Sequence, residues 1–297
     1  MKTKVIGILL AFLAAIFYSL STPISKLLME EVSPVFMASF LYFGAFVGVG
    51  IMYLFKFKKE DKSLKLTKDD IFYVVGMVLL DVIAPILMMF GINIGTSSEA
   101  SLLNNFEIVA TSLIALIFFK EGISKKLWVG ISLIFASSVI LSFNFEEKIS
   151  FSLGSLLVLL ATLCWGIENN FTRKISSKST YQIVIIKGLG SSICSCVIAL
   201  IMKESFPSLL YIGIALLLGF VAYGLSIFTY IRAQKIIGAS KTSAYYSISP
   251  FIGALLSFLI LNEKLGINYL IGLVLMIGGT ILVVIDTLSQ KEDLSLK

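Results

Sequence analysis

Two acidic residues interrupt otherwise apolar stretches of this chain. Glu107 lies in LLNNFEIVATSLIALIFFKE (102–121), three residues after Asn104, and Asp81 lies in another apolar stretch with Pro85 one helical turn later. A carboxylate at membrane depth costs about 2.5–3.5 kcal/mol on insertion scales, so an intramembrane acid is a functional candidate by default. Spacing of three and seven residues also puts Asn104, Glu107 and Thr111 on one face of a continuous helix.

We therefore predict Glu107, Asn104 and Asp81 as substrate-binding residues. Two carboxylates in one low-dielectric cavity favour protonation of one of them. That property is what proton coupling requires, so Glu107 and Asp81 are also the predicted proton-coupling residues, and binding of a cationic substrate is the alternative. A structural role, as a protonated or paired acid, stays open for both.

Aromatic side chains at matching positions in other apolar stretches could surround these acids. Aromatic faces stack on apolar or cationic ligands, although packing or a place at the membrane interface explains most such residues. The predicted binding aromatics are Tyr18, Trp165, Tyr223, Tyr245 and Tyr246.

Other polar residues in these stretches have structural interpretations. Lys187 could neutralise Glu168, which predicts a structural ion pair, with a cytoplasmic gate as the alternative. Glu121 and Glu263 are expected at opposite membrane faces in structural or interfacial roles. The spacing Gly44-x-x-x-Gly48 predicts close helix packing. The chain has no histidine, and its three cysteines lie within apolar stretches, so we expect neither a metal site nor a cofactor.

Composition gives the setting of these residues. Hydrophobic residues make up 58% of the 297 residues and charged residues 14%, whereas soluble domains have about 45–50% and 25%. The mean hydropathy is +0.98. A soluble protein with this surface would aggregate, so we predict an integral membrane protein.

Apolar runs of about twenty residues, bounded by charge or turn residues, predict ten membrane spans. No pattern of alternating strands is present, so the fold class is an all-α helical bundle and not a barrel. The spans are predicted near 4–25, 34–55, 71–91, 97–118, 126–143, 152–172, 183–202, 209–231, 242–261 and 267–285.

The basic residues predict the orientation in the plasma membrane. With both termini cytoplasmic, nineteen lysines and arginines lie inside and four outside, and Lys187 lies within a span. This bias follows the positive-inside rule, and a nine-span topology breaks it. The net charge of +6 therefore reflects topology. The expected partners are the lipid bilayer and a small-molecule substrate, with no nucleic acid.

The two halves of the sequence resemble each other. GILLAFLAAIFYSLSTPISKLL (7–28) aligns with GSLLVLLATLCWGIENNFTRKI (154–175), and 117–141 aligns with 259–283. Five spans per half is an odd number, so the second half would enter the membrane from the opposite side. We predict two inverted five-helix repeats, residues 1–145 and 146–297, with a binding site near the membrane midplane between them.

The repeat ends LIALIFFKEGISKKLWVGISLIFASSVIL and FIGALLSFLILNEKLGINYLIGLVLMIGGTILV each carry a glutamate, a glycine nine residues later and then small residues. With these segments, and with FYSLSTPISKLL, the chain resembles EamA-type members of the drug/metabolite transporter superfamily over essentially its whole length. The resemblance implies ten spans in two fused units and export or exchange of small metabolites. One departure is that Glu107-Ile108 stands where the second repeat, like the family, has Pro250.

The sequence leaves three alternative functions to weigh. The first is a secondary transporter of a small organic metabolite that exports or exchanges it by alternating access, with proton coupling as an option. The second is a membrane-embedded enzyme, but no nucleophile–base set, histidine or phosphate-binding loop supports it. The third is a scaffold or receptor, which has little reason to hold Asp81 and Glu107 in the membrane. We therefore predict a transporter and no enzymatic activity.

Overall fold

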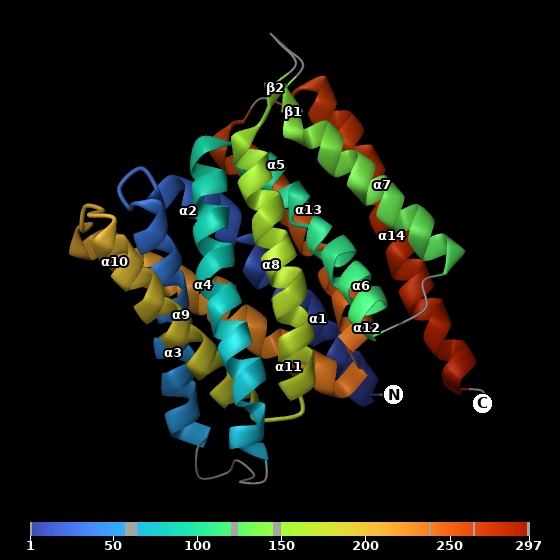
Figure 1. The fold of residues 1–297 in the computed structure, drawn as a ribbon, viewed down its shortest axis with the longest axis horizontal. Helices are drawn as coiled ribbons and strands as arrows, with labels where there is room; N and C mark the ends of the chain where they lie inside the picture. The colour runs from blue at the N-terminus through green and yellow to red at the C-terminus, as the bar shows by residue number, and fades with distance from the viewer. Residues whose placement is uncertain are drawn as a thin grey trace.

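The computed structural model describes residues 2–56, 64–119, 124–144, 150–237, 239–263 and 265–295. These residues are almost entirely helical (Figure 1). The exception is a two-residue antiparallel pair, in which β1 (Phe143–Asn144) meets β2 (Ser150–Phe151). Both chain ends lie toward the same end of the helix bundle in Figure 1.

Nine helical segments of the described residues, 18 to 29 residues long, are long and apolar enough to cross a membrane. The chain is therefore an all-helical, multi-pass integral membrane protein. The segments contain α1 (Lys2–Ser19) with α2 (Ser21–Leu28), α3 (Pro34–Lys56), η3 (Lys68–Asp70) with α4 (Ile71–Ile94), α7 (Lys125–Ser142), α8 (Leu153–Ile175), α9 (Thr180–Ile201), α10 (Leu209–Leu218) with η4 (Gly219–Leu225) and α11 (Ser226–Ile237), α12 (Ala239–Tyr246) with α13 (Ser249–Leu261), and α14 (Ile267–Ser295).

The stretch predicted as a continuous span over 97–118 consists of two short helices, α5 (Ser97–Leu103) and α6 (Phe106–Phe119). Between them the chain makes a tighter turn, in which the amides of Glu107 and Ile108 donate to carbonyls three residues back at 3.1 Å each. Consecutive asparagines favour such a break because their side chains compete for backbone hydrogen bonds. The predicted continuous face from Asn104 through Glu107 was therefore wrong.

A second interruption falls between α12 and α13, at Ser247 and Ile248. Pro250 follows as one of the first residues of α13, a place where proline is tolerated because its missing amide hydrogen has no partner to lose. The broken stretches α5–α6 and α12–α13 thus have the same plan, a short helix followed by a longer one.

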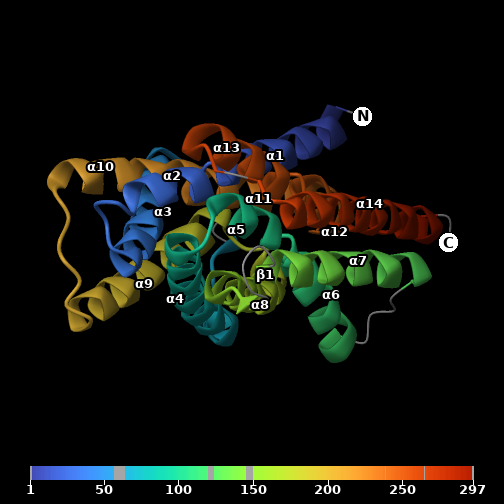
Figure 2. The same cartoon turned by 90° about the horizontal axis from the view of Figure 1, so that it is seen from above.

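The helices pack in pairs drawn from distant parts of the sequence. Helix α4 packs along α8, α3 along α9, α7 along α14 and α1 along α11. Figure 2 shows the α7–α14 pair at one side of the bundle. Close approach depends on glycine: a Cβ on Gly44 would lie 2.1 Å from the Leu216 carbonyl oxygen, and one on Gly279 would lie 2.8 Å from the Gly130 oxygen. The predicted close packing at Gly44 is confirmed.

Charged side chains from elsewhere in the sequence bind the ends of several helices. Glu263 accepts hydrogen bonds from the amides of Ser97 and Ser98, at 2.7 and 2.8 Å, at the start of α5. Lys26 donates to the carbonyls of Ile92, Asn93 and Gly95, at 2.7 to 2.9 Å, at the end of α4. Each charge has the sign that the helix dipole favours. The structural role expected for Glu263 fits this contact, while Glu121 lies outside the described residues.

The glycine contacts predict a stability difference within α3. Gly44→Val should lower the free energy of unfolding by about 1–3 kcal/mol, because the added side chain collides with the backbone of α10. Gly50→Val is the matched control, since a Cβ there meets no atom within 4 Å. Thermal unfolding of both purified variants measures the effect. Equal melting temperatures for the two would contradict the close approach.

Candidate functional site

A cavity lies where α1, α3, α6, α8, α9, α11 and α12 come together. It contains about 610 Å³ of empty space, counting the part that is open to solvent. The lining side chains are Tyr18, Tyr42, Glu107, Trp165, Glu168, Asn169, Thr172, Lys187, Tyr223, Ser226, Ile227, Tyr230, Ile231 and Tyr246.

Two helices supply most of this wall by simple periodicity. On α8 the lining residues are Trp165, Glu168, Asn169 and Thr172, which are spaced by three, four and seven residues and so share one face. The residues from η4 and α11 repeat the pattern, beginning at Tyr223. The segment η4 is a π-helical turn, a local widening that is frequent at functional sites.

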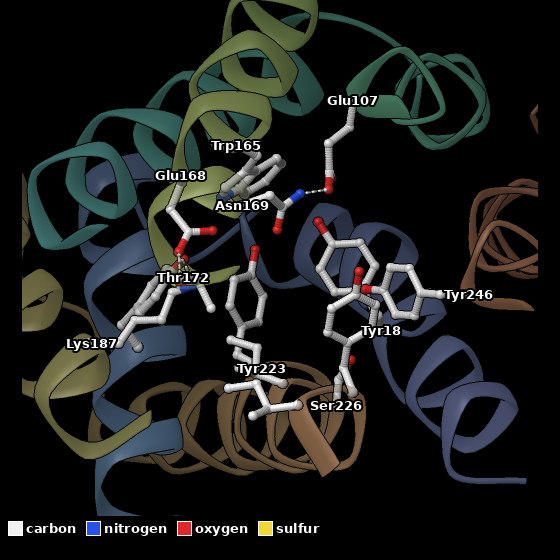
Figure 3. A pocket seen from close by; sticks show the side chains of 14 residues that line it. Tyr18, Glu107, Trp165, Glu168, Asn169, Thr172, Lys187, Tyr223, Ser226 and Tyr246 are labelled. Carbon is white, nitrogen blue, oxygen red and sulfur yellow. Dashed lines mark hydrogen bonds and ion pairs between the residues drawn. The ribbon is translucent and has the colours of Figure 1, made fainter. Parts of the chain in front are cut away.

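Glu107 lies in the first turn of α6, directly after the break. Asn169 of α8 donates a hydrogen bond from its amide nitrogen to Oε1 of Glu107 (Figure 3). Among the described residues, no lysine or arginine nitrogen lies within ion-pair distance of this carboxyl group. The amide groups at the start of α6 favour negative charge there. Within the described part of the chain, Glu107 is thus a cavity carboxyl with a polar partner and no paired cation.

Asp81 lies in a separate, buried ion-pair cluster. Nζ of Lys187 is 3.0 Å from Asp81 and 2.9 Å from Glu168, and the Tyr42 hydroxyl donates to Asp81 at 2.8 Å. Thr172 donates to Glu168. Asp81 is 0% exposed, Glu168 2% and Lys187 5%. Two carboxylates share one ammonium group here, and Asp81 does not line the cavity beside Glu107 as the sequence predicted.

The predicted aromatics divide between the cavity and its surroundings. The ring of Tyr18 lies 5.8 Å from that of Tyr223, 5.9 Å from that of Tyr246 and 6.5 Å from that of Trp165, between centroids. Figure 3 shows Tyr18 and Tyr246 on the side of Glu107, and Tyr223 nearer to the Glu168–Lys187 pair. Four of the five predicted aromatics therefore line one space.

Besides Asp81, two more predicted binding residues lie outside the cavity wall. Tyr245 packs against Phe12 of α1, with ring centroids 5.5 Å apart. Adjacent residues of a helix point about 100° apart, so Tyr245 and Tyr246 cannot both face the same space. Asn104 lies behind Tyr18 and donates to its hydroxyl at 3.3 Å; it supports a lining residue without lining the cavity.

Sequence reasoning missed several lining residues, and some of them carried a signal. Asn169 and Thr172 follow Trp165 at helical spacing, so one predicted aromatic on α8 could have found them. Tyr230 is related to Tyr223 in the same way. Tyr42 carried no such signal, because its place at the cavity depends on how α3 packs against α9 and η4.

Comparison with known proteins agrees with this architecture. The model of the EamA-like transporter family matches residues 5–143 and again residues 152–285. The chain belongs to the EamA-like transporter family. Its expected membership of the drug/metabolite transporter superfamily is therefore confirmed.

Relatives of this EamA-like protein occur in archaea and bacteria. An uncharacterized transporter of Methanothermobacter thermautotrophicus is 26% identical over 292 residues, covering 90% of this chain and 82% of that protein. The uncharacterized transporter YyaM of Bacillus subtilis is 24% identical over 239 residues, covering 76% of each chain. A crystal structure with 14% identity matches at a TM-score of 0.70, covering 96% of this chain and 98% of the other; this likeness shows a shared fold.

The ion-pair cluster predicts a specific stability defect. Lys187→Met should destabilise the protein by about 3–5 kcal/mol, because it leaves two buried carboxylates facing each other without a cation. The loss should be greater at alkaline than at acidic pH, since protonation relieves the repulsion. Thermal unfolding across pH measures both effects.

Two further variants test the cause of that defect. Lys126→Met, which removes an exposed lysine of α7, should leave stability unchanged. The triple variant Lys187→Met, Asp81→Asn, Glu168→Gln should recover part of the loss. A Lys187→Met protein as stable as the Lys126→Met protein would contradict the buried network.

Proposed function

We propose that this EamA-like protein is a secondary transporter that exports or exchanges a small organic metabolite across the plasma membrane by alternating access. The observation that carries the proposal is a cavity inside a membrane bundle, with the carboxyl of Glu107 on its wall and no cation of the described residues paired to it. Transporter relatives and the family match support the general class. The described residues of the cavity wall include no nucleophile–base set, so the wall gives no support to enzymatic activity.

We assign the domains to two inverted repeats, residues 1–145 and 146–297. The family model matches once in each half. The breaks at Asn104–Asn105 and Ser247–Ile248 fall at equivalent places in the two halves. Helix pairs expected to cross a two-fold axis in the membrane plane, α3 with α9 and α7 with α14, pack against each other. With the basic loops inside, both termini are cytoplasmic.

The two ends of this pseudo-symmetric bundle differ. Helix α5 packs along α13, and Ser97 Oγ lies 2.9 Å from Ser257 Oγ between them. The pair related to it by the proposed two-fold axis is α6 with α12, which has no comparable packing among the described residues. In the proposed orientation, the α5–α13 contact closes the extracellular side. The cavity, which lies toward α6 and α12, would face the cytoplasm.

Glu107 is the residue we assign to coupling. It touches the cavity, and its charge is not neutralised by a cation of the described chain, so it can bind either a proton or the substrate. Asp81 and Glu168 already share Lys187, so we assign them to holding α4, α8 and α9 together beside the cavity. Proton exchange at Glu107 would link the substrate flux to the pH gradient.

The coupling role predicts a transport defect without a folding defect. Glu107→Gln should reduce substrate flux in proteoliposomes by about tenfold or more and abolish its response to a pH gradient, because the amide can neither release a proton nor pair with a cation. Flux and its pH dependence are the measurements. Glu99→Gln, a change of the same kind outside the cavity, is the control, and wild-type flux in Glu107→Gln would remove Glu107 from the mechanism.

The contact between α5 and α13 predicts that a cross-link between these two helices blocks transport reversibly. Cysteines introduced at Ser97 and Ser257, in a background without Cys164, Cys194 and Cys196, should form a disulfide that holds α5 on α13. Transport should stop on oxidation and return on reduction, because alternating access requires these helices to separate. Each single-cysteine protein is the control. Full transport by the cross-linked protein would contradict the proposed opening.

A further inference from the structure

The charges around the cavity are unevenly distributed. Glu107 and Glu168 lie on its wall, Asp81 lies directly behind, and Lys187 is the cation that faces it among the described residues. Lys187 is already held by two carboxylates at 2.9 and 3.0 Å. An anionic ligand would have to compete with both of them and would also face Glu107. The field inside the cavity therefore favours positive charge.

The tyrosine rings offer aromatic faces more than free hydroxyls. The hydroxyl of Tyr42 is bonded to Asp81 at 2.8 Å, and that of Tyr230 to Ser243 at 2.7 Å. Tyr18 accepts from Asn104 at 3.3 Å. With these hydroxyls engaged in protein contacts, the rings contribute mainly their faces, and aromatic faces attract cations, including quaternary ammonium groups.

The rings and the carboxyl group occupy the same part of the cavity. Tyr18 and Tyr246 are 5.9 Å apart between centroids, and the ring of Tyr230 lies 4.9 Å beyond Tyr246. Figure 3 shows Tyr18 and Tyr246 on the side of the cavity where Glu107 enters. The side chain of Tyr223, which is 2% exposed, also lines this space.

We propose that the substrate is a small organic cation, an amine or a quaternary ammonium compound, whose charged nitrogen binds beside Glu107 against the faces of Tyr18 and Tyr246. This assignment rests on the proposed transport function and specifies its substrate class. Binding of the cation and binding of a proton at Glu107 are then mutually exclusive, because each neutralises the same carboxylate. That competition is the condition for exchanging one for the other.

A direct test uses probes that differ in charge but little in shape. The ammonium probes are 2-phenylethylammonium and choline, their neutral counterparts are 2-phenylethanol and 3,3-dimethylbutanol, and the anion is phenylacetate. Trp165 lines the cavity and Trp128 is the other tryptophan of the chain. Fluorescence of purified Trp128→Phe protein therefore reports binding beside Trp165, without requiring transport.

The expected result is saturable binding of at least one ammonium probe, with its neutral and anionic counterparts weaker by about tenfold or more. Glu107→Gln should weaken binding of the ammonium probe by about tenfold. Tyr246→Leu should weaken this binding by about three- to tenfold, and Tyr246→Phe, which keeps the ring, should change the affinity little. Tyr245→Leu is the matched control on the same helix and should bind as the unsubstituted protein does.

The outcomes separate the substrate class from the transport function. No preference for the cations, no binding of either one, or an unaffected Glu107→Gln protein would overturn the assignment. If the protein carries a neutral or anionic solute into proteoliposomes but binds no cation, the transport function is supported and the proposed substrate class is overturned. If the protein binds a cation but does not transport it, the proposed ligand class is supported and the transport function is contradicted.

Discussion

The absence of water in the bilayer interior constrains every polar group of this EamA-like protein. A charge or backbone group buried there must find its partner within the protein. Lys187 meets this demand with Asp81 and Glu168, which come from two other helices. Glu263 and Lys26 meet it at the ends of α5 and α4. Against this background, Glu107 is distinctive because its hydrogen-bond partner among the described residues is a neutral amide, that of Asn169.

The same constraint explains where the helices are broken. Interrupted helices are tolerated at membrane depth only where protein or a water-filled cavity surrounds them. The break at Asn104–Asn105 is buried, with side chains 5% and 1% exposed. It places Glu107 in the first turn of a new helix, whose dipole favours a carboxylate there. The break therefore connects the local sequence to the electrostatics of the cavity.

The sequence predicted the helical segments well because burial in lipid demands long apolar runs with charged ends. Predicted and observed boundaries of α3 and α8 differ by at most three residues. It also selected Glu107, Tyr18, Trp165, Tyr223 and Tyr246, since polar and aromatic residues are informative in such runs. The assignment of Glu107 to coupling remains a prediction.

Other features depended on packing that periodicity does not encode. Asp81 and Glu107 both lie deep in apolar stretches, but only contacts between α4 and α9 decide that Asp81 pairs with Lys187. Tyr245 and Tyr246 are chemically equivalent candidates, and the rotation of α12 separates them. The break at Asn104 depends on local competition for backbone hydrogen bonds, which a count of apolar residues ignores.

The central claim is that Glu107 lies in a water-accessible cavity open toward the cytoplasm. Cysteine accessibility tests it most directly, with Glu107→Cys in a cysteine-free background and a charged, membrane-impermeant thiol reagent. The account predicts labelling of this position from the cytoplasmic side, while Leu79→Cys, on the exposed outer face of α4, stays unlabelled. Protection of position 107 from both sides, or labelling no faster than at position 79, would contradict it.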